Sequence, residues 1–424
     1  MTNDEAVLIT SKKWLKDVEI GPTAISNVRQ GEPFTIRGVT IEDCIRGGYE
    51  YTCWLLLEGE SRHHQTLDNF KLDLHRYLTI PTQMTWFVRE TVSQADGRLT
   101  ICDLLRTCIS HLQAHPIQPS DANEDRRYTE AKRLIAASAT IVAQICLFLD
   151  ERQIDQDTVV VPEIPTSFAE SFLRMLKNGR PDSDHVMFFD RALVLYAEHG
   201  FAASTIAVRV TASTGSDAYS GIAAGVGALQ GWLHGGANKA VMDILLNDIH
   251  CRDHLWRAAM KTYIDQIRAA GGRVPGFGNP VHRGAPDPRV DLLRDGPADG
   301  VAMWEHRSLG APVDGYPDDA ERKDLFHIAD VFAEQVKRIR PGENNRLLYP
   351  NIDLPAGVLF HQMGLSPTGL YPAIFACARM PGWLAHYYEH DPGTCGLMRP
   401  GGYCQDNIVV KKQTVTAIKG NKKQ

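Results

Sequence analysis

Residues 231–238 read Gly-Trp-Leu-His-Gly-Gly-Ala-Asn, and they join two segments of helical periodicity, 216–231 and 237–247. The first segment is rich in glycine and alanine, so other backbones can approach it closely and we expect it to be buried. His234 then lies on a turn just before the second helix begins. A helix N-terminus disfavours positive charge, so this histidine would stay neutral and donate a hydrogen bond to a carbonyl oxygen. Taken alone, a structural histidine at a helix junction explains the pattern better.

Helical periodicity continues in both directions from this turn. It predicts further helices at 41–58, 64–77, 81–95, 99–113, 128–150, 166–178, 184–199, 202–213, 251–270, 319–340, 353–363 and 368–390. Residues 14–41 instead carry short apolar runs broken by Gly-Pro and Gly-Glu-Pro, which predicts minor β-structure near the N-terminus. A last strand is expected within 408–418. The fold class is therefore all-α, with a small amount of strand.

A chain of 424 residues is too long for one ordinary core. Residues 271–318 hold many glycines, prolines and aspartates, which is typical of a long functional loop or an inserted lobe. We predict a large helical domain formed by residues 1–236 and 346–424. A small mobile domain would comprise residues 237–345, since glycine-rich turns at 234–236 and 271–278 bracket a segment that can move.

The net charge of −6 does not attract nucleic acid or an anionic membrane, so arginines must hold any anionic ligand locally. No apolar run is judged long enough to span a membrane, and the acidic start, Met1 to Ala6, is unlike a secretory signal. These features predict a cytoplasmic protein, with a mitochondrial location as the alternative. The nine cysteines are scattered without a Cys-x-x-Cys pair, which predicts buried free thiols and no zinc site.

Other residues have the chemistry of a site and also an ordinary structural explanation. His199 precedes Ser204 and Thr205, which have the character of a helix N-cap, so His199 reads as a cap-region histidine. Asp353 stands at the mouth of a predicted helix, where a carboxylate is usually an N-cap; desolvated beside an acyl group, it would be a base. Three arginines matter only if the fold brings them together: Arg289, Arg379 and Arg399.

The loop 271–283 has features of a ligand-binding loop. Gly276 and Gly278 let the backbone approach a ligand, while Arg273, His282 and Arg283 offer charge for phosphates. No predicted strand precedes the loop, so a flexible surface loop explains it equally well.

Taken together and in this order, these motifs resemble the citrate synthase family, including 2-methylcitrate and alkylcitrate synthases. The resemblance runs from about Trp14 to Cys404, nearly the full chain. It rests on TAIS at 23–26, RG at 37–38, AEHGF at 197–201, AST at 203–205 and 212–214, HGGAN at 234–238, GFG at 276–278, DPR at 287–289, YPNID at 349–353, GWLAH at 382–386 and RP at 399–400.

The resemblance implies an α-helical homodimer, with a large and a small domain in each subunit that close over the substrates. Its members condense an acyl-CoA with oxaloacetate or a close 2-oxo acid, giving a citrate or 2-alkylcitrate and CoA. By resemblance, Asp353 removes a proton from the acyl α-carbon while His234 donates a hydrogen bond to the thioester oxygen. A lone carboxylate is a poor base for that proton, so polarising the thioester lowers the barrier.

The resemblance also implies the binding residues. Oxaloacetate is a dianion, and paired N–H groups of arginine suit its carboxylates. The residues implied to hold it are His199, Arg289, Arg379 and Arg399, the last reaching across the dimer. Those implied to bind CoA are Gly276, Gly278 and Arg283. No metal and no cofactor are implied, because the CoA thioester is itself a substrate.

Asn279 is the largest departure from the family pattern, which has Gly-Phe-Gly-His at 276–279. That histidine contacts the keto oxygen and supplies a proton, whereas asparagine donates only a hydrogen bond. We keep Asn279 among the catalytic positions, with an altered role. His282 lies three residues further on, and a displacement of that size need not reach the same point. Ala202, Trp232 and residues 354–356 also depart from the pattern, which predicts a reshaped pocket.

Three functions stay open from the sequence. The first is a working synthase with altered substrates, such as a longer acyl-CoA or a modified keto acid used in secondary metabolism. The second is a partial reaction, such as condensation without hydrolysis or cleavage in reverse, and the third is a non-catalytic binder of CoA or a carboxylic acid. We favour the first, because His234, Asp353 and the three arginines are all retained, and a decayed enzyme loses such residues readily.

Overall fold

The computed structural model describes residues 21–58, 66–115, 117, 125–150, 158–249, 255–270, 273–297, 303, 325–337, 347–390 and 392–399. The chain starts with three short antiparallel strands, β1 (Ser26–Asn27), β2 (Thr35–Ile36) and β3 (Val39–Thr40), in the order β1-β2-β3. Ser26 pairs with Ile36, and Thr35 with Thr40. The expected minor β-structure is confirmed over this stretch, while the expected strand at 408–418 lies outside the described residues.

Apart from connecting loops, the rest of the described chain is helical, which confirms the predicted fold class. The first group of helices is α1 (Ile41–Gly47), α2 (Tyr49–Glu58), α3 (Leu67–Tyr77), α4 (Thr82–Ala95), α5 (Ile101–Leu112), α6 (Arg126–Leu149), α7 (Phe168–Lys177), α8 (Ser183–Ala197), α9 (Ala203–Ser213) and α10 (Ala218–Leu229). The second group is α11 (Ala237–Asp243), the π-helix η2 (Ile244–Asp248), α12 (Trp256–Ala270), α13 (Pro288–Asp295), α14 (Leu325–Lys337), α15 (Asp353–Gln362), the 3-10 helix η4 (Thr368–Leu370), α16 (Tyr371–Glu389) and α17 (Pro392–Cys395).

Polar side chains at the helix starts explain many of these boundaries. Thr40, Thr66, Ser167 and Asp182 each accept a hydrogen bond from a backbone N–H in the first turn of the helix that follows. Such caps satisfy N–H groups that have no partner inside the helix. The predicted helix 41–58 is interrupted at Gly48, where φ is +83°, a backbone conformation that favours glycine.

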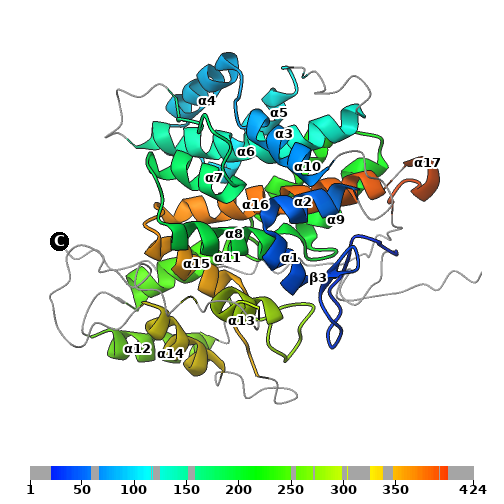
Figure 1. The fold of residues 1–424 in the computed structure, drawn as a ribbon. Coiled ribbons are helices and arrows are strands. Elements are labelled where there is room, and N and C mark those ends of the chain that lie inside the picture. The colour runs from blue at the N-terminus through cyan, green and yellow to red at the C-terminus, as the bar shows by residue number, and fades with distance from the viewer. Residues whose placement is uncertain are drawn as a thin grey trace, which may run out of the picture.

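The helix α6 lies at the centre of the large helical body and packs against α3, α4, α5, α7 and α16 (Figure 1). It is long and apolar enough to span a membrane, which corrects the expectation that no segment of the chain is. However, 83% of its apolar stretch is buried inside the protein. Its side chains therefore meet other helices of this chain, which is the usual environment of a core helix.

Two helices at the middle of the molecule, α8 and α16, position the candidate site. The helix α16 packs against α8, α9, α10 and α6, and it is buried along most of its length. Gly382 allows the closest approach, because a Cβ at this position would overlap the carbonyl oxygen of Ala197 at the end of α8. The ends of α8, α9 and α16 are thereby held together.

A smaller group of helices lies at one end of the molecule, where α12 packs against α14 and α14 against α15 (Figure 1). The helix α13 contacts both α8 and α15, and α11 contacts α15. The predicted division into residues 1–236 with 346–424 and residues 237–345 stays a prediction. Much of the second segment lies outside the described residues, including 304–324 and 338–346.

Candidate active site

The turn that carries His234 has the geometry expected from its sequence. The helix α10 ends at Leu229, and α11 begins at Ala237. The backbone N–H of His234 donates to the carbonyl oxygen of Gly231 at 2.9 Å. A Cβ at Gly235 would overlap the side chain of Leu229, so glycine is required for the chain to fold back onto the end of α10.

His234 is held by a short chain of hydrogen bonds. Its Nε2 lies 2.7 Å from the Oγ of Ser204, and the indole N–H of Trp383 donates to the same Oγ at 3.2 Å. Because the indole can only donate, this arrangement leaves the Ser204 hydroxyl proton free to bond Nε2 and favours a proton on Nδ1. Burial, together with the nearby charges of Arg379 and Arg289, lowers the pKa of His234 to about 4.

The position of Ser204 corrects one expectation from the sequence. Ser204 and Thr205 do not cap α9; both lie inside the helix and are buried, and the N-cap residue is Ala202, which makes no side-chain cap. A polar residue that looks like a cap in the sequence is here a partner of His234. Only the pairing of α9 with the turn after α10 reveals this contact, and sequence spacing does not.

Asp353 is the first residue of α15, and its side chain does not cap that helix. Its own backbone N–H donates to Oδ1 of Asn351 at 3.0 Å, and the N-cap residue, Ile352, makes no side-chain cap. The Asp353 carboxylate is buried and accepts a hydrogen bond from the Tyr196 hydroxyl at 3.0 Å. Burial raises the pKa of Asp353 to about 6, although the Tyr196 bond and Arg289 act in the opposite direction.

Arg289 and Arg379 are both buried close to these two groups. Arg289 pairs with Asp287 through its Nε and Nη2, at 3.0 and 2.7 Å. Arg379 donates from its Nε to the carbonyl oxygen of Tyr196 and lies over the ring of Phe375. Its Nη1 is buried with no hydrogen-bond partner among the described residues. Burial lowers the pKa of Arg379 to about 10, so it remains a cation at neutral pH.

His199 follows α8 and points toward the same region. It is buried, and its Nε2 has no hydrogen-bond partner within the described part of the chain. Burial and then the charge of Arg289 lower the pKa of His199 well below its usual value, so it is neutral. A buried polar atom without a partner is costly in a folded protein, so this one points to a ligand.

The loop with Gly276, Gly278 and Asn279 folds against the segment that leads into α15. The N–H of Gly278 donates to Tyr349 at 2.8 Å, and Gly276 accepts from the N–H of Asn351 at 2.9 Å. Both glycines have φ of +77°, which favours glycine. The loop is therefore tied directly to the residues that position Asp353.

Asn279 is occupied by contacts within its own loop. Its Nδ2 donates to Oδ2 of Asp287 at 3.0 Å, and its Oδ1 accepts from the N–H of Val281 at 2.8 Å. The second contact closes an Asx turn, a local turn that asparagine side chains favour. The turn directs the next residues back toward His199.

Two predicted residues are more exposed than the buried members of this group. Arg283 donates from its Nε to the carbonyl oxygen of Pro280 at 2.9 Å, at the outer side of the loop. Arg399 is exposed after α17, whereas Arg289 and Arg379 are buried. The structure therefore brings together His234, Asp353, His199, Arg289 and Arg379, with Asn279 at the edge.

Sequence reasoning missed Tyr196 and Phe375, and it gave Ser204 a capping role. Phe375 stacks on Tyr196 at a centroid distance of 4.0 Å and meets His234 edge to face at 5.9 Å. It thus contacts both His234 and the tyrosine that bonds Asp353. An aromatic residue inside a long apolar helix has no signal that separates it from ordinary core residues.

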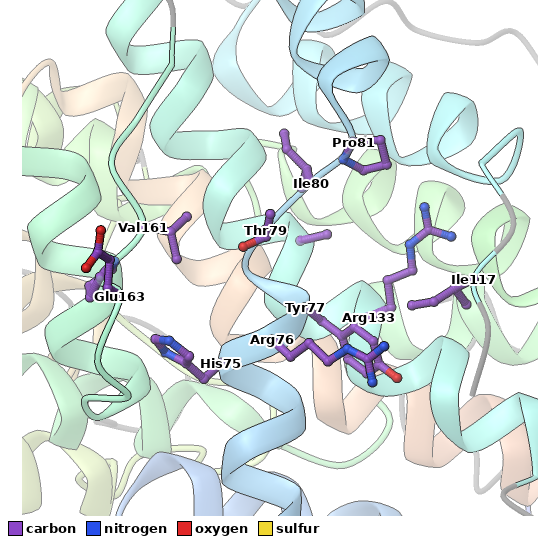
Figure 2. A pocket seen from close by; sticks show the side chains of 12 residues that line it. His75, Arg76, Tyr77, Thr79, Ile80, Pro81, Ile117, Arg133, Val161 and Glu163 are labelled. Atoms are coloured by element: carbon purple, nitrogen blue, oxygen red, sulfur yellow. The ribbon is translucent and has the colours of Figure 1, made fainter. Parts of the chain in front are cut away.

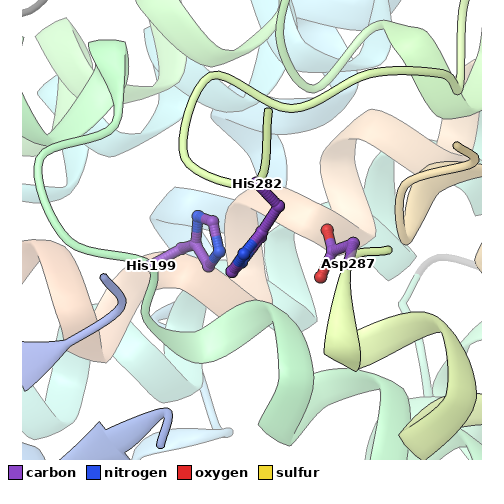
Figure 3. A group of neighbouring side chains, drawn as sticks. All are labelled: His199, His282 and Asp287. Carbon is purple, nitrogen blue, oxygen red and sulfur yellow. The ribbon is translucent and has the colours of Figure 1, made fainter. Parts of the chain in front are cut away.

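His199, His282 and Asp287 are also close enough to be considered as metal ligands, with one potential ligand atom from each lying within 4.8 Å of the others (Figure 3). However, Asp287 already accepts four hydrogen bonds: from the N–H, Nε and Nη2 of Arg289 and from Nδ2 of Asn279. A carboxylate has about four acceptor positions, so none is left for a metal. The nearby arginines also disfavour a cation, and the group is better suited to an anion.

A separate cavity of about 710 Å³ lies between the end of α3, α6 and residues 161–163 (Figure 2). Its lining includes Arg76, Tyr77 and Arg133, and none of the candidate site residues. Arg133 is engaged with the Tyr219 hydroxyl and the carbonyl oxygen of Leu112, at 3.3 and 3.2 Å. The cavity therefore has no part in the chemistry of the His234 region.

The helical fold agrees with comparisons to known proteins. The family model described as “Citrate synthase, C-terminal domain” matches residues 14–401, so the chain belongs to the citrate synthase family. It is a citrate synthase-like acyltransferase, and its general reaction is the condensation of an acyl-CoA with oxaloacetate.

Two curated relatives illustrate the range of the family. A 2-methylcitrate synthase of Mycobacterium tuberculosis is 31% identical over 399 residues, covering 93% of this chain and 90% of that protein. A citrate synthase of Haloferax volcanii is 31% identical over 357 residues, covering 83% and 84%. Because similar identity is found to both kinds of synthase, the identity does not select the acyl substrate.

Solved structures show the same fold. Citrate synthase from Pyrobaculum aerophilum matches with a TM-score of 0.72 and 27% identity, covering 93% of this chain and 94% of the other. Citrate synthase from Thermoplasma acidophilum, in a ternary complex with carboxymethyl coenzyme A and oxaloacetate, matches with a TM-score of 0.72 and 24% identity, covering 93% and 97%.

Proposed function

We propose that this chain condenses an acyl-CoA with oxaloacetate or a related 2-oxo acid, and that its acyl or keto-acid specificity is altered. The observation that carries the proposal is a pair of buried polar atoms, Arg379 Nη1 and His199 Nε2, that have no partner among the described residues. Arg379 lies beside the buried carboxylate of Asp353 and the neutral His234, and its charge also acts on His199. A dianionic keto acid supplies the acceptors that these two groups lack.

In this proposal Asp353 is the base for the acyl α-carbon, and His234 donates from Nδ1 to the thioester oxygen. A carboxylate whose pKa is about 6 is ionised at neutral pH and is still more basic than an ordinary aspartate. A neutral histidine polarises the thioester oxygen through a hydrogen bond from its N–H group. His199, Arg289 and Arg379 bind the keto acid, and the loop with Gly276, Gly278 and Arg283 binds CoA.

Altered specificity is supported by the residues next to His234 and Asp353. Trp232 and Leu233 are exposed beside the His234 turn, at 59% and 62% of their surface. Leu354 is buried directly after Asp353. A large side chain at 232 changes the apolar space at the acyl end, and the altered acyl-CoA use fits alkylcitrate formation in secondary metabolism.

The remaining parts of the proposal follow from the family. The chain acts as a homodimer in the cytoplasm, and Arg399 completes the keto-acid site of the partner subunit. The reaction uses no metal or separate cofactor. In support, α10 leaves Ala223, Ala224 and Gly227 partly exposed beside Arg106 and Thr107 of α5, a shallow surface of small residues. Small residues allow two helices to pack closely.

The test is to incubate the purified protein with oxaloacetate and a series of acyl-CoAs of increasing chain length. Free thiol release and product mass are measured together. We expect a citrate or 2-alkylcitrate product with at least one acyl chain. A full series without product would reject the synthase proposal, and calorimetric CoA binding without turnover would then support the non-catalytic binder.

A partial reaction is the second candidate, and Asn279 favours it. Asparagine stands where the family has a proton-donating histidine, and its amide is engaged with Asp287 and Val281. Product mass separates the two candidates, because condensation without hydrolysis gives a CoA thioester of the product and no free thiol.

A further inference from the structure

The loop after Asn279 returns a histidine to the candidate site. His282 is half-buried, and its ring lies 6.0 Å from the ring of His199, tilted by 55°. Figure 3 shows the two imidazoles next to each other, with the Asp287 carboxylate facing them. The three-residue displacement on the loop therefore does not keep His282 away from the keto-acid region, because the Asx turn at Asn279 bends the chain back.

The spacing allows both histidines to contact one ligand atom. A ring nitrogen of His199 and a ring nitrogen of His282 lie within 4.8 Å of each other. A hydrogen bond from nitrogen to oxygen is about 2.9 Å long, so two nitrogens at this spacing reach a single oxygen between them. A carbonyl oxygen held by His199 is thereby within reach of His282.

The two histidines differ in their ability to carry a proton. His199 is buried beside Arg289 and Arg379, which both oppose a positive charge on it. His282 is only half-buried, and although burial lowers its pKa, the Asp287 carboxylate acts in the opposite direction. Arg289 is the other charged group that acts on it, again lowering its pKa. A bound dianion would offset Arg289 and favour the protonated form of His282.

We propose that His282 is the catalytic acid that protonates the keto oxygen, in place of the histidine that this chain lacks at position 279. This inference rests on the proposed condensation. The α-carbon of the enolised thioester forms a bond to the keto carbon, and the C=O π-electron pair moves onto the oxygen. Protonated His282 gives its N–H proton to that oxygen and becomes neutral, and solvent returns the proton to the half-exposed ring.

Asn279 then has a positioning role. Its Oδ1 holds the N–H of Val281, and its Nδ2 holds Asp287, so one side chain fixes both the turn and the carboxylate that faces His282. In this view asparagine at 279 positions the loop and histidine at 282 supplies the proton.

The experiment compares two half-reactions in the full-length protein. Enolisation is followed as exchange of the acyl-CoA α-protons with deuterated solvent, in the presence of a keto-acid analogue that cannot be attacked. Condensation is followed as thiol release with oxaloacetate. For His282→Asn we expect condensation to fall by about 10²- to 10⁴-fold, the usual loss for a general acid, while exchange changes less than about threefold.

The matched control is His327→Asn, because His327 is exposed on α14 and has no role in the proposed site. It should leave both rates unchanged. Calorimetric binding of oxaloacetate shows whether the His282 variant is folded. The imidazole of His282, assigned by its loss from the NMR spectrum of the variant, should titrate at a higher pH when oxaloacetate is bound.

The outcomes separate the two proposals. A wild-type protein that neither exchanges nor condenses overturns both the proposed function and the role of His282. An active wild type whose His282→Asn variant condenses at the normal rate overturns the role of His282 alone. Equal loss of exchange and condensation in that variant also overturns it, because that pattern indicates a structural role.

Discussion

At the scale of single residues, the contact between Tyr196 and Asp353 sets the conditions under which the candidate base works. The Tyr196 hydroxyl donates at 3.0 Å to a carboxylate whose pKa burial raises to about 6. Above that pH the carboxylate is ionised and accepts a proton; below it the carboxylate is protonated and cannot. We therefore expect kcat/KM to fall as pH decreases through about 6, and Asp353→Asn to lose about 10²- to 10⁴-fold in rate. A pH–rate profile with no acid limb near this value would contradict the assignment.

Replacing Tyr196 by Phe tests the hydrogen bond itself. The bond stabilises the ionised form of Asp353, so its removal raises the pKa of the carboxylate and moves the acid limb of kcat/KM to higher pH. Tyr388→Phe is the matched control, since the Tyr388 hydroxyl donates to the carbonyl oxygen of Arg127, away from the site. A limb that stays in place in the Tyr196 variant would show that another group titrates there.

His234 depends in a similar way on Ser204. Removing the hydroxyl in Ser204→Ala leaves Nε2 of His234 without its partner at 2.7 Å. The tautomer with its proton on Nδ1 is then no longer favoured. We expect kcat to fall by about 10-fold or more, in line with the cost of losing one hydrogen bond to a buried group. Ser110→Ala on α5 is the control, because Ser110 is exposed. Equal rates in the two variants would remove Ser204 from the proposed mechanism.

At the scale of elements, periodicity predicted helices well, because nearly all of them bury one face against the core. Periodicity did not predict two local changes in the helices. Gly48 separates α1 from α2, and the predicted helix 237–247 changes from α11 into the π-helix η2. The candidate site was predicted only where a motif marks it. Ser204 and Asp353 both read as caps in the sequence, since the choice between a cap and a tertiary partner depends on what packs opposite, which spacing does not contain.

The crossing of α8 and α16 is an element-scale feature that can be tested. A methyl group at Gly382 would overlap the carbonyl oxygen of Ala197, and backbone cannot move aside as a flexible side chain can. We expect Gly382→Ala to lower the free energy of unfolding by about 1–3 kcal/mol or more, the usual cost of overpacking. Gly369→Ala is the control, because nothing lies within 4 Å of the position that its Cβ would take. Denaturant unfolding measures both, and similar midpoints would show that α16 can shift without cost.

At the scale of the whole molecule, the three arginines proposed to hold the keto acid differ in burial. Arg289 and Arg379 are buried together, but Arg399 is exposed after α17. The sequence could not separate an arginine that acts within its own subunit from one that acts on a partner, because both have the same motif. The proposed homodimer accounts for this exposure, since an exposed arginine can enter a neighbouring subunit.

Mixing two inactive variants tests this arrangement directly. His234→Ala removes a candidate catalytic group, and Arg399→Ala removes the arginine proposed to act across the interface. In a heterodimer of the two, one site would combine an intact His234 with an intact Arg399 of the partner subunit. After denaturation and refolding as an equal mixture, about half of the dimers are mixed and about a quarter of all sites are intact, so about a quarter of wild-type activity should return. If Arg399 served its own subunit, every site would lack one group and no activity would return. Each variant refolded alone is the control, and light scattering on the same samples establishes whether a dimer forms.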